Sequence, residues 1–265
     1  MSALSDVLAR AKAEGRAALI GYLPVGFPSV DLSIDAMRAM VAGGVDVVEV
    51  GVPYSDPVMD GPTIQAAAEP AVRAGVNLAD ALRAVATVVE AGAVAVIMSY
   101  WNPIDRYGVA RFAADLAAAG GAGAITPDLI PEEAAQWLTS SDTHQLDRVF
   151  LVAPSSTDAR ISSTAAASRG FVYAASTMGV TGARASVGGA AESLVGRVRI
   201  LAPDIAVCVG LGVSDGDQAA EVAAFADGVI VGSAFVRRLL DSPDRAGVAA
   251  VRELAAELAA GVRRG

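Results

Sequence analysis

The feature that most constrains the fold of this 265-residue chain is a repeat of short apolar runs, each followed by a longer Ala-rich stretch with helical spacing. Such alternation predicts repeated βα units. Because the runs are almost continuously apolar, we expect strands buried on both faces, as parallel strands covered by helices are. Eight runs qualify: Ala17–Leu23, Val45–Val50, Val94–Met98, Gly123–Ile125, Arg148–Val152, Gly170–Ala174, Ile205–Val209 and Gly228–Val231. Eight units in a chain of this length predict a single α/β domain over residues 1–265, a (β/α)8 TIM barrel.

Helices are expected between these strands. The clearest are Leu32–Ala42, Leu78–Glu90, Val109–Ala119, Pro131–Leu138 and Asp215–Phe225. An extra amphipathic N-terminal helix is predicted within Met1–Arg16, which lacks the apolar region of a signal peptide. The most apolar stretch, Val85–Met98, is too short to cross a bilayer and is interrupted by Glu90 and Gly92. We therefore expect no membrane segment.

Composition excludes several classes of partner. A net charge of -9 argues against a nucleic-acid or anionic-membrane surface, because both require clustered Lys and Arg. The one cysteine, Cys208, lies inside the apolar run Ile205–Val209, so it is expected to be buried and no disulfide can form within the chain. We expect a reducing, cytoplasmic setting.

Two carboxylates in different surroundings form the strongest chemical signal. Glu49 ends the apolar run Val45–Val50, and Asp60 follows in a Gly- and Pro-rich loop. Burial raises the pKa of a carboxyl group at a strand end, whereas one in a polar loop stays ionised, so the pair could divide acid and base roles. In a TIM barrel both positions lie on the catalytic face. The alternative is a satisfied strand end and an ordinary turn Asp.

Missing residue types narrow the chemistry. The only lysine, Lys12, precedes the first strand, which leaves no candidate for a Schiff base at the catalytic face. The only histidine, His144, lies in a polar segment, so neither a His-ligated metal nor a histidine base is expected. We expect no metal site. Carboxylates, tyrosines and backbone amides remain.

Two glycine-containing turns predict a phosphate site. They follow the seventh and eighth strands, at Gly210–Ser214 and Gly232–Ala234. In a TIM barrel these loops commonly bind phosphate through backbone N–H groups and a helix N-terminus, with no need of Lys or Arg. The alternative is that these glycines simply end strands.

Motifs along nearly the whole chain resemble those of one family. They are Gly21-Tyr22 with Gly26-Phe27-Pro28, the segment Glu49–Gln65, Tyr100–Pro103 with Tyr107-Gly108, Pro127–Leu129, Gly170–Tyr173, Gly179–Gly182, and Asp227–Val229 with Val231–Ser233. The chain thus resembles the alpha subunit of tryptophan synthase. The resemblance implies reversible retro-aldol cleavage of indole-3-glycerol phosphate to indole and glyceraldehyde 3-phosphate.

The same resemblance implies roles for individual residues. Glu49 is similar to the family's acid/base, Asp60 to the carboxylate that receives the indole N–H, and Tyr173 to its active-site tyrosine. The phosphate contacts correspond to Gly182, Gly212, Gly232 and Ser233. Candidates for the indole pocket and lid are Tyr22, Met98, Tyr100, Leu129, Thr181 and Leu211, although several would serve equally well in core packing. The chain departs from the family pattern at Leu211, Ile125-Thr126 and Met59, which bears on the shape of the ring pocket.

The resemblance further implies a partner. This is a tryptophan synthase beta subunit that carries pyridoxal phosphate, in a complex of two alpha and two beta chains, with no cofactor in this chain. Pro53–Pro57 and the Asn102-Pro103 loop are the candidate contacts. The Gly-containing loop Ser176–Gly189 is expected to be mobile and to close over the site, with Thr181 reaching the Asp60 loop.

Three alternatives remain open at this point. Another barrel enzyme acting on a phosphorylated sugar would carry a similar phosphate site. A non-catalytic scaffold would only activate a partner, although both carboxylates are present. A stand-alone lyase would release indole without a beta subunit.

Overall fold

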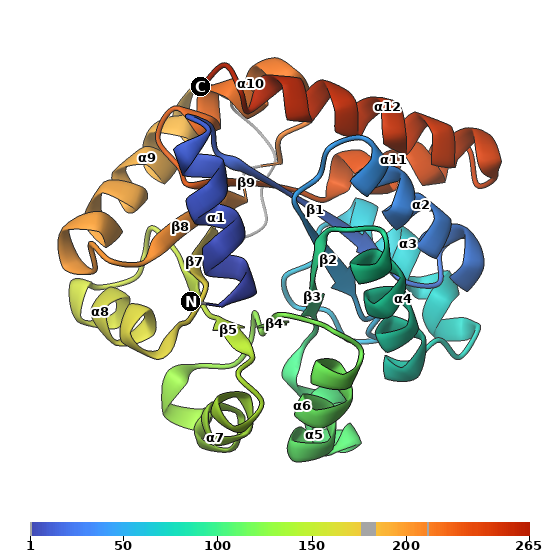
Figure 1. Cartoon of the computed structure of the whole chain (residues 1–265), viewed down its shortest axis with the longest axis horizontal. Helices are drawn as coiled ribbons and strands as arrows, with labels where there is room; N and C mark the ends of the chain where they lie inside the picture. Colours follow the sequence, from blue (N-terminus) through green and yellow to red (C-terminus); the bar gives the residue numbers. More distant parts are fainter. Residues whose placement is uncertain (1, 176–183, 211) are drawn as a thin grey trace.

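The computed structural model describes residues 2–175, 184–210 and 212–265, in which parallel strands form one nearly closed barrel ringed by helices (Figure 1). The strand order is β5-β4-β3-β2-β1-β9-β8-β7-β6, and every neighbouring pair is parallel. The strands are β1 (Ala18–Pro24), β2 (Val47–Gly51), β3 (Val94–Met98), β4 (Gly123–Ile125), β5 (Asp147–Val149), β6 (Leu151–Val152), β7 (Phe171–Ala175), β8 (Ala206–Gly210) and β9 (Gly228–Val231). The (β/α)8 prediction is confirmed.

Helices occupy the connections between strands. They are α1 (Ala3–Ala13), α2 (Val30–Ala42), α3 (Pro62–Arg73), α4 (Leu78–Glu90), α5 (Trp101–Tyr107), α6 (Val109–Ala118), the 3-10 turn η1 (Pro131–Glu133), α7 (Ala135–Thr143), α8 (Asp158–Ala167), α9 (Arg184–Leu201), α10 (Gly216–Ala223), α11 (Ser233–Asp241) and α12 (Arg245–Gly261). Side-chain caps fix several starts: Ser29 accepts from the Leu32 N–H, and Asn77 forms a capping box with Asp80. In the described residues, no helix is long and apolar enough to cross a membrane.

Two apolar clusters hold the fold. The larger lies between the outer faces of the strands and the helices, and it includes Met37, Phe112 and Trp137. The smaller fills the barrel interior with side chains that alternate along each strand, such as Ile20, Val47 and Phe171. Burial of this kind contributes roughly 1.5–3 kcal/mol for each large side chain.

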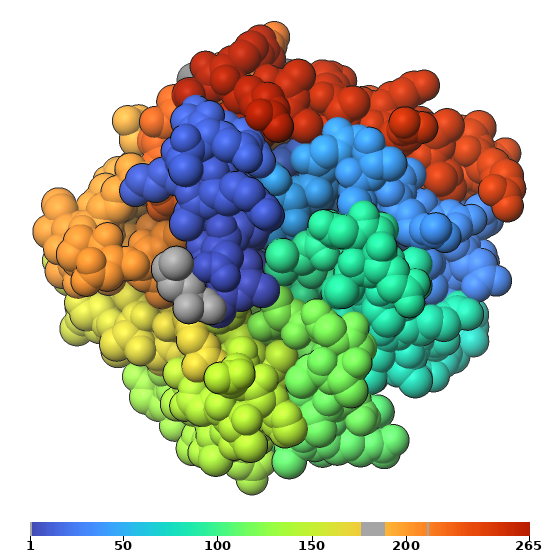
Figure 2. All heavy atoms as spheres, in the orientation of Figure 1, coloured from blue at the N-terminus to red at the C-terminus, as the bar shows by residue number. Residues whose placement is uncertain are grey.

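The predicted N-terminal helix closes one end of the barrel. The buried residues of α1 are Leu4, Val7, Leu8 and Ala11, and they belong to the interior cluster. Figures 1 and 2 show α1, in dark blue, lying across the centre of the ring of helices. Because α1 covers the N-terminal ends of the strands, the opposite end, where the strands' C-termini meet, is left to form the site.

The structure corrects three sequence predictions. The predicted strand Arg148–Val152 is divided at Phe150: β5 pairs with β4, and β6 pairs with β7. The predicted helix Pro131–Leu138 is a 3-10 turn followed by α7, which continues to Thr143 and buries Trp137 and Ser141. The predicted loop Ser176–Gly189 is helical from Arg184 onward, and the remainder, 176–183, lies outside the described residues.

Candidate active site

The two strands at the centre of the candidate site place their side chains by simple alternation. Ile20 on β1 and Val47 on β2 point into the barrel, so Tyr22 and Glu49, two residues further on, share that face. The parallel register pairs Tyr22 with Glu49 directly. Both side chains therefore lie at the C-terminal end of the barrel interior, above the apolar cluster.

Glu49 is a buried acid with no counter-charge among the described residues. The residue is 1% exposed, and its Oε1 atom has no hydrogen-bond partner among the described residues. Desolvation by burial raises the pKa of this carboxyl group from 4.5 to about 8. Glu49 is therefore largely protonated at neutral pH and can act as a proton donor.

Asp60 lies in the loop between β2 and α3 and is held toward the same site. The Tyr100 hydroxyl donates to Asp60 Oδ1 at 3.1 Å, and Gln65 Nε2 donates to the Asp60 carbonyl oxygen at 2.7 Å. Burial raises the pKa of Asp60, and the hydrogen bond from Tyr100 opposes that rise. The expected polar, freely ionised setting is thus only partly right, because Asp60 is half-buried.

Tyrosines surround the two acids. Burial, and then the charges of Asp60 and Glu49, raise the pKa of Tyr22 well above its ordinary value. Burial followed by the charge of Glu49 also raises the pKa of Tyr173 on β7. The direct register of Tyr22 with Glu49 places these two side chains side by side. Because both pKa values are raised, the hydroxyls of Tyr22 and Tyr173 stay protonated at neutral pH.

Two glycines make room for these rings, a role that the sequence analysis assigned to neither. A Cβ added at Gly51 would lie 2.6 Å from both Cε2 and the hydroxyl oxygen of Tyr22. A Cβ added at Gly210 would overlap the Tyr173 hydroxyl. The sequence signal was their spacing, since Gly51 follows Glu49 by two residues on one strand face and Gly210 ends β8. Only the pairing of strands shows which side chain each glycine accommodates.

The predicted phosphate seat lies where α11 begins. Gly232 is the N-cap of α11 and Ser233 its first residue, and no side chain in the described part of the chain caps this end. Helix N-termini offer unpaired N–H groups and partial positive charge to an anion. Gly212 is exposed with φ +70°, a conformation that favours glycine, in the neighbouring loop after β8.

Comparison with known proteins fits this geometry. The sequence matches the family described as "Tryptophan synthase alpha chain" over residues 8–263. The chain belongs to the tryptophan synthase alpha chain family. It is 62% identical over 266 residues to the tryptophan synthase alpha chain of Thermobifida fusca, covering 99% of this chain and 98% of that protein. A solved structure of Mycobacterium tuberculosis tryptophan synthase is similar with a TM-score of 0.93 and 59% identity, covering 100% of this chain and 99% of the other. An alpha-chain structure from Legionella pneumophila str. Paris gives a TM-score of 0.88 at 28% identity, covering 99% and 98%.

Membership settles the activity. As a tryptophan synthase alpha chain, this protein is a lyase of tryptophan biosynthesis that cleaves indole-3-glycerol phosphate. It works with a beta subunit, which makes tryptophan. The sequence-based reading of the family, the reaction and the partner is confirmed, and the sugar-phosphate and scaffold alternatives are set aside.

The other predicted site residues of this alpha chain differ in where they lie. Met98 packs against the interior cluster at the end of β3, and Tyr100 is 5% exposed at the start of α5. Leu129 is buried in the outer cluster, so a role in the indole pocket stays a prediction for it. Gly182, Thr181 and Leu211 lie outside the described residues.

A polar rim, largely missed by the sequence reading, borders the site. The Tyr54 ring lies 5.2 Å from the Tyr100 ring, and Asn102 Nδ2 donates to the Tyr54 hydroxyl at 3.1 Å. The Trp101 N–H donates to Asp128 Oδ1 at 2.9 Å. These contacts tie the loops after β2, β3 and β4 together. They hold Tyr100, and through it Asp60, in position.

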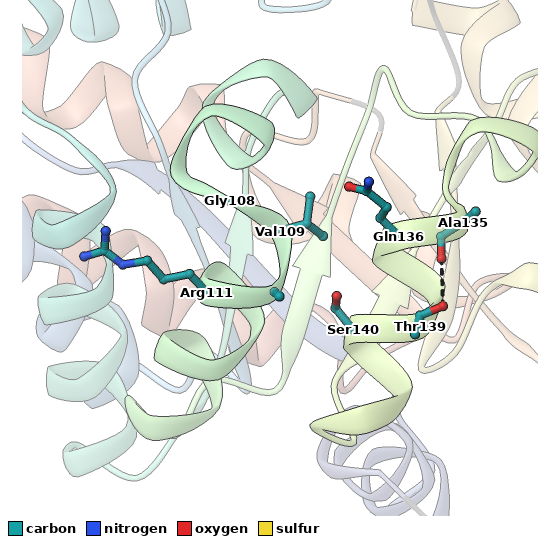
Figure 3. A pocket seen from close by; sticks show the side chains of 8 residues that line it. Gly108, Val109, Arg111, Ala135, Gln136, Thr139 and Ser140 are labelled. Carbon is teal, nitrogen blue, oxygen red and sulfur yellow. Dashed lines mark hydrogen bonds between the residues drawn. The ribbon is translucent and has the colours of Figure 1, made fainter.

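The alpha chain also has an open groove away from these residues. It measures about 600 Å³ and lies between the starts of α6 and α7, where Val109 and Gln136 face the gap and Arg111 points away (Figure 3). None of its lining residues is a predicted site residue. In the described ranges, no group of three or more His, Cys, Asp or Glu side chains could hold a metal ion.

Proposed function

We propose that Glu49 and Asp60 carry out the retro-aldol cleavage of indole-3-glycerol phosphate. The observation that supports this most strongly is the burial of Glu49, with an unpaired Oε1 and a pKa raised to about 8. A carboxylic acid that is still protonated at neutral pH can deliver its proton to carbon C3 of the indole ring.

Asp60 stabilises the intermediate that this protonation creates. Adding a proton at C3 gives an indolenine with positive charge at the ring nitrogen. An ionised carboxylate at that nitrogen lowers the energy of the charged species and accepts the N–H hydrogen bond. The 3.1 Å hydrogen bond from Tyr100 to Oδ1 favours the ionised form of Asp60 and fixes its orientation.

Glu49 then completes the reaction as a base. Having lost its proton to C3, the Glu49 carboxylate takes the proton of the C3′ hydroxyl. The bond between C3 and C3′ breaks, its electron pair returns to the indole ring, and C3′ becomes the aldehyde carbon of glyceraldehyde 3-phosphate. The proton count balances, since Glu49 ends protonated. Tyr173 is proposed to pack against the reacting ring.

The substrate phosphate is proposed to bind at the start of α11 and at Gly212, with Gly182 as a further contact. Gly232 and Ser233 place backbone N–H groups at an uncapped helix N-terminus. With a net charge of -9, the chain needs such a local arrangement to hold an anion. The predicted pocket residues, Tyr22, Met98, Tyr100, Leu129 and Leu211, with Thr181 in the lid, would surround the indole ring.

Gly232→Val is expected to weaken phosphate binding strongly and leave the fold intact. The side chain would cover the amides that approach the oxygens. The backbone at Gly232 has φ -122°, which other residues adopt. A Cβ there would lie 3.3 Å from Tyr22 Cδ1, a tight contact that a small shift of the Tyr22 ring relieves. Calorimetry with glycerol phosphate measures the effect, and Gly196→Val, on the exposed side of α9, is the control. Equal affinity in the Gly232 variant and the parent would move the phosphate seat elsewhere.

The beta subunit is proposed to dock on the face that carries the site. Large exposed apolar side chains border that face: Val58, 77% exposed, and Met59 lie in the loop before α3, and Ile130 lies in the loop after β4. They adjoin the predicted contacts Pro53–Pro57 and Asn102-Pro103. Docking there would pass indole to pyridoxal phosphate in the beta subunit of a two-alpha, two-beta complex.

One experiment tests this arrangement. The purified chain is incubated with indole-3-glycerol phosphate, with and without the beta subunit of the same source, while glyceraldehyde 3-phosphate release and gel-filtration mass are followed. Val58→Asp should weaken association, and Ile200→Asp, at an 82% exposed site near the end of α9, should not. Full activity with no association would instead indicate a stand-alone lyase.

The chain is further proposed to act in the cytoplasm as one domain over residues 1–265. The buried, unpaired thiol of Cys208 suits a reducing compartment. Strands from the first and last thirds of the chain pair directly, β1 with β9, which supports a single cooperative unit.

A further inference from the structure

The Tyr22 side chain spans the rim of the barrel between the phosphate seat and the acid pair. A Cβ added at Gly232 would lie 3.3 Å from Tyr22 Cδ1 and 3.5 Å from its Cβ, so the base of the side chain adjoins the start of α11. A Cβ at Gly51 would lie 2.6 Å from the hydroxyl oxygen, so the far end of the ring rests on β2. Gly51 is two residues beyond Glu49 on the same strand face.

The Tyr22 hydroxyl, at this far end, is a hydrogen-bond donor that is free to bind a ligand. Tyr22 is half-buried, and among the described residues its hydroxyl has no hydrogen-bond partner, unlike Tyr100, which donates to Asp60. Burial, together with the charges of Asp60 and Glu49, keeps its pKa well above the ordinary value. The group thus retains its proton next to two acids.

The chemistry of the substrate limits what this donor can meet. The indole ring has one polar group, an N–H, which offers no acceptor. The phosphate oxygens are assigned to the opposite end of the Tyr22 side chain, at Gly232. The oxygens that remain are those of the glycerol chain, which must cross from the phosphate seat to Glu49 over the Tyr22 ring.

We infer that the Tyr22 hydroxyl donates a hydrogen bond to a hydroxyl oxygen of the glycerol chain and so makes the site selective for a hydroxylated side chain. The inference rests on the proposed placement of the phosphate and of the two acids. Tyr22 then acts in two ways: its ring packs against the substrate, and its hydroxyl donates a hydrogen bond to the glycerol chain.

Binding to two ligands tests the inference. The first is indole-3-glycerol phosphate, and the second is 3-(indol-3-yl)propyl phosphate, which keeps the ring and phosphate but lacks both hydroxyls. Affinities are measured by calorimetry in a Glu49→Gln background, so that the first ligand is not consumed. Tyr22→Phe removes only the hydroxyl. It should weaken binding of the glycerol compound by about 3- to 10-fold, the usual effect of one hydrogen bond, and leave the propyl compound unchanged.

Two further variants sharpen the result. Gly51→Ala places a Cβ 2.6 Å from both Cε2 and the hydroxyl oxygen of Tyr22, so it should displace the whole ring and weaken binding of both compounds. Tyr107→Phe removes a hydroxyl bonded to Asp115 on the outer surface and should change neither affinity.

The outcomes separate this inference from the function on which it rests. If Tyr22→Phe lowers both affinities equally, or neither, the hydroxyl does not read the glycerol chain, although the site stands. If the parent background binds neither ligand, the site itself is misplaced and the inference fails with it.

Discussion

Glu49→Gln is expected to abolish cleavage of indole-3-glycerol phosphate while leaving the fold and phosphate binding intact. The amide has the shape of the acid but cannot donate the proton to C3 or accept one from the C3′ hydroxyl. General acid/base groups contribute roughly 100- to 10,000-fold to rates, and here one group is used twice. The measurement is kcat for glyceraldehyde 3-phosphate release with the beta subunit present. Glu90→Gln, on the exposed end of α4, is the matched control.

Retention of more than about a tenth of parental activity would show that Glu49 is not the acid and base of this reaction.

The Glu49→Gln variant should also change how the free energy of unfolding depends on pH. Because burial raises the pKa of Glu49 from 4.5 to about 8, the folded chain holds this proton over a range where the unfolded chain has lost it. Stability due to this group therefore falls as pH rises from about 4.5 to about 8, and the amide should abolish that fall.

Asp60→Asn should lose nearly as much activity as the Glu49 variant. The amide can still accept the hydrogen bond from Tyr100, so the loop keeps its anchor, but the negative charge facing the ring nitrogen is gone. Removing one electrostatic stabiliser of a transition state costs on the order of 100- to 1,000-fold in kcat. The effect should appear in kcat more than in KM, because the charge on the nitrogen develops only during reaction.

The matched control is Asp204→Asn, which neutralises an exposed acid between α9 and β8, far along the chain from either catalytic loop. Both variants change net charge equally, so any difference between them reports on position. An Asp60 variant with parental kcat and a raised KM would mean that Asp60 only binds the ground state.

Much of the barrel could be predicted because local signals and tertiary packing agree. The strand Val94–Met98 and the helix Leu78–Glu90 have the predicted bounds, since each combines a strong apolar pattern with clear end signals. The predictions were wrong where local residue types suggested a loop but the segment is helical in the structure. The Ser- and Thr-containing end of α7 was predicted as a polar loop, yet it is helical because α7 buries Trp137 and Ser141 against the barrel. Gly188 and Gly189 suggested a loop, but both lie within α9, whose later turns bury Leu194 and Val198.

Some features of the candidate site could also be predicted from the sequence, and others could not. Burial of Glu49 followed from its place at the end of an apolar run, and the structure bears it out. The half-burial of Asp60 did not follow, because it depends on Tyr100, forty positions away, closing over the loop. The roles of Gly51 and Gly210 depend on which ring lies across each of them, and strand register decides that.

A buried, protonated Glu49 is proposed to start the reaction. The pH dependence of kcat/KM for cleavage, measured with the beta subunit saturating, tests this proposal most directly because this ratio reports ionisations of the free enzyme. The rate should fall as pH rises, with a midpoint near the pKa of about 8 that burial gives Glu49. A rate that stays level through pH 8 and begins to fall only at much higher pH, or that falls with a midpoint near the ordinary 4.5 of a glutamic acid, would contradict it.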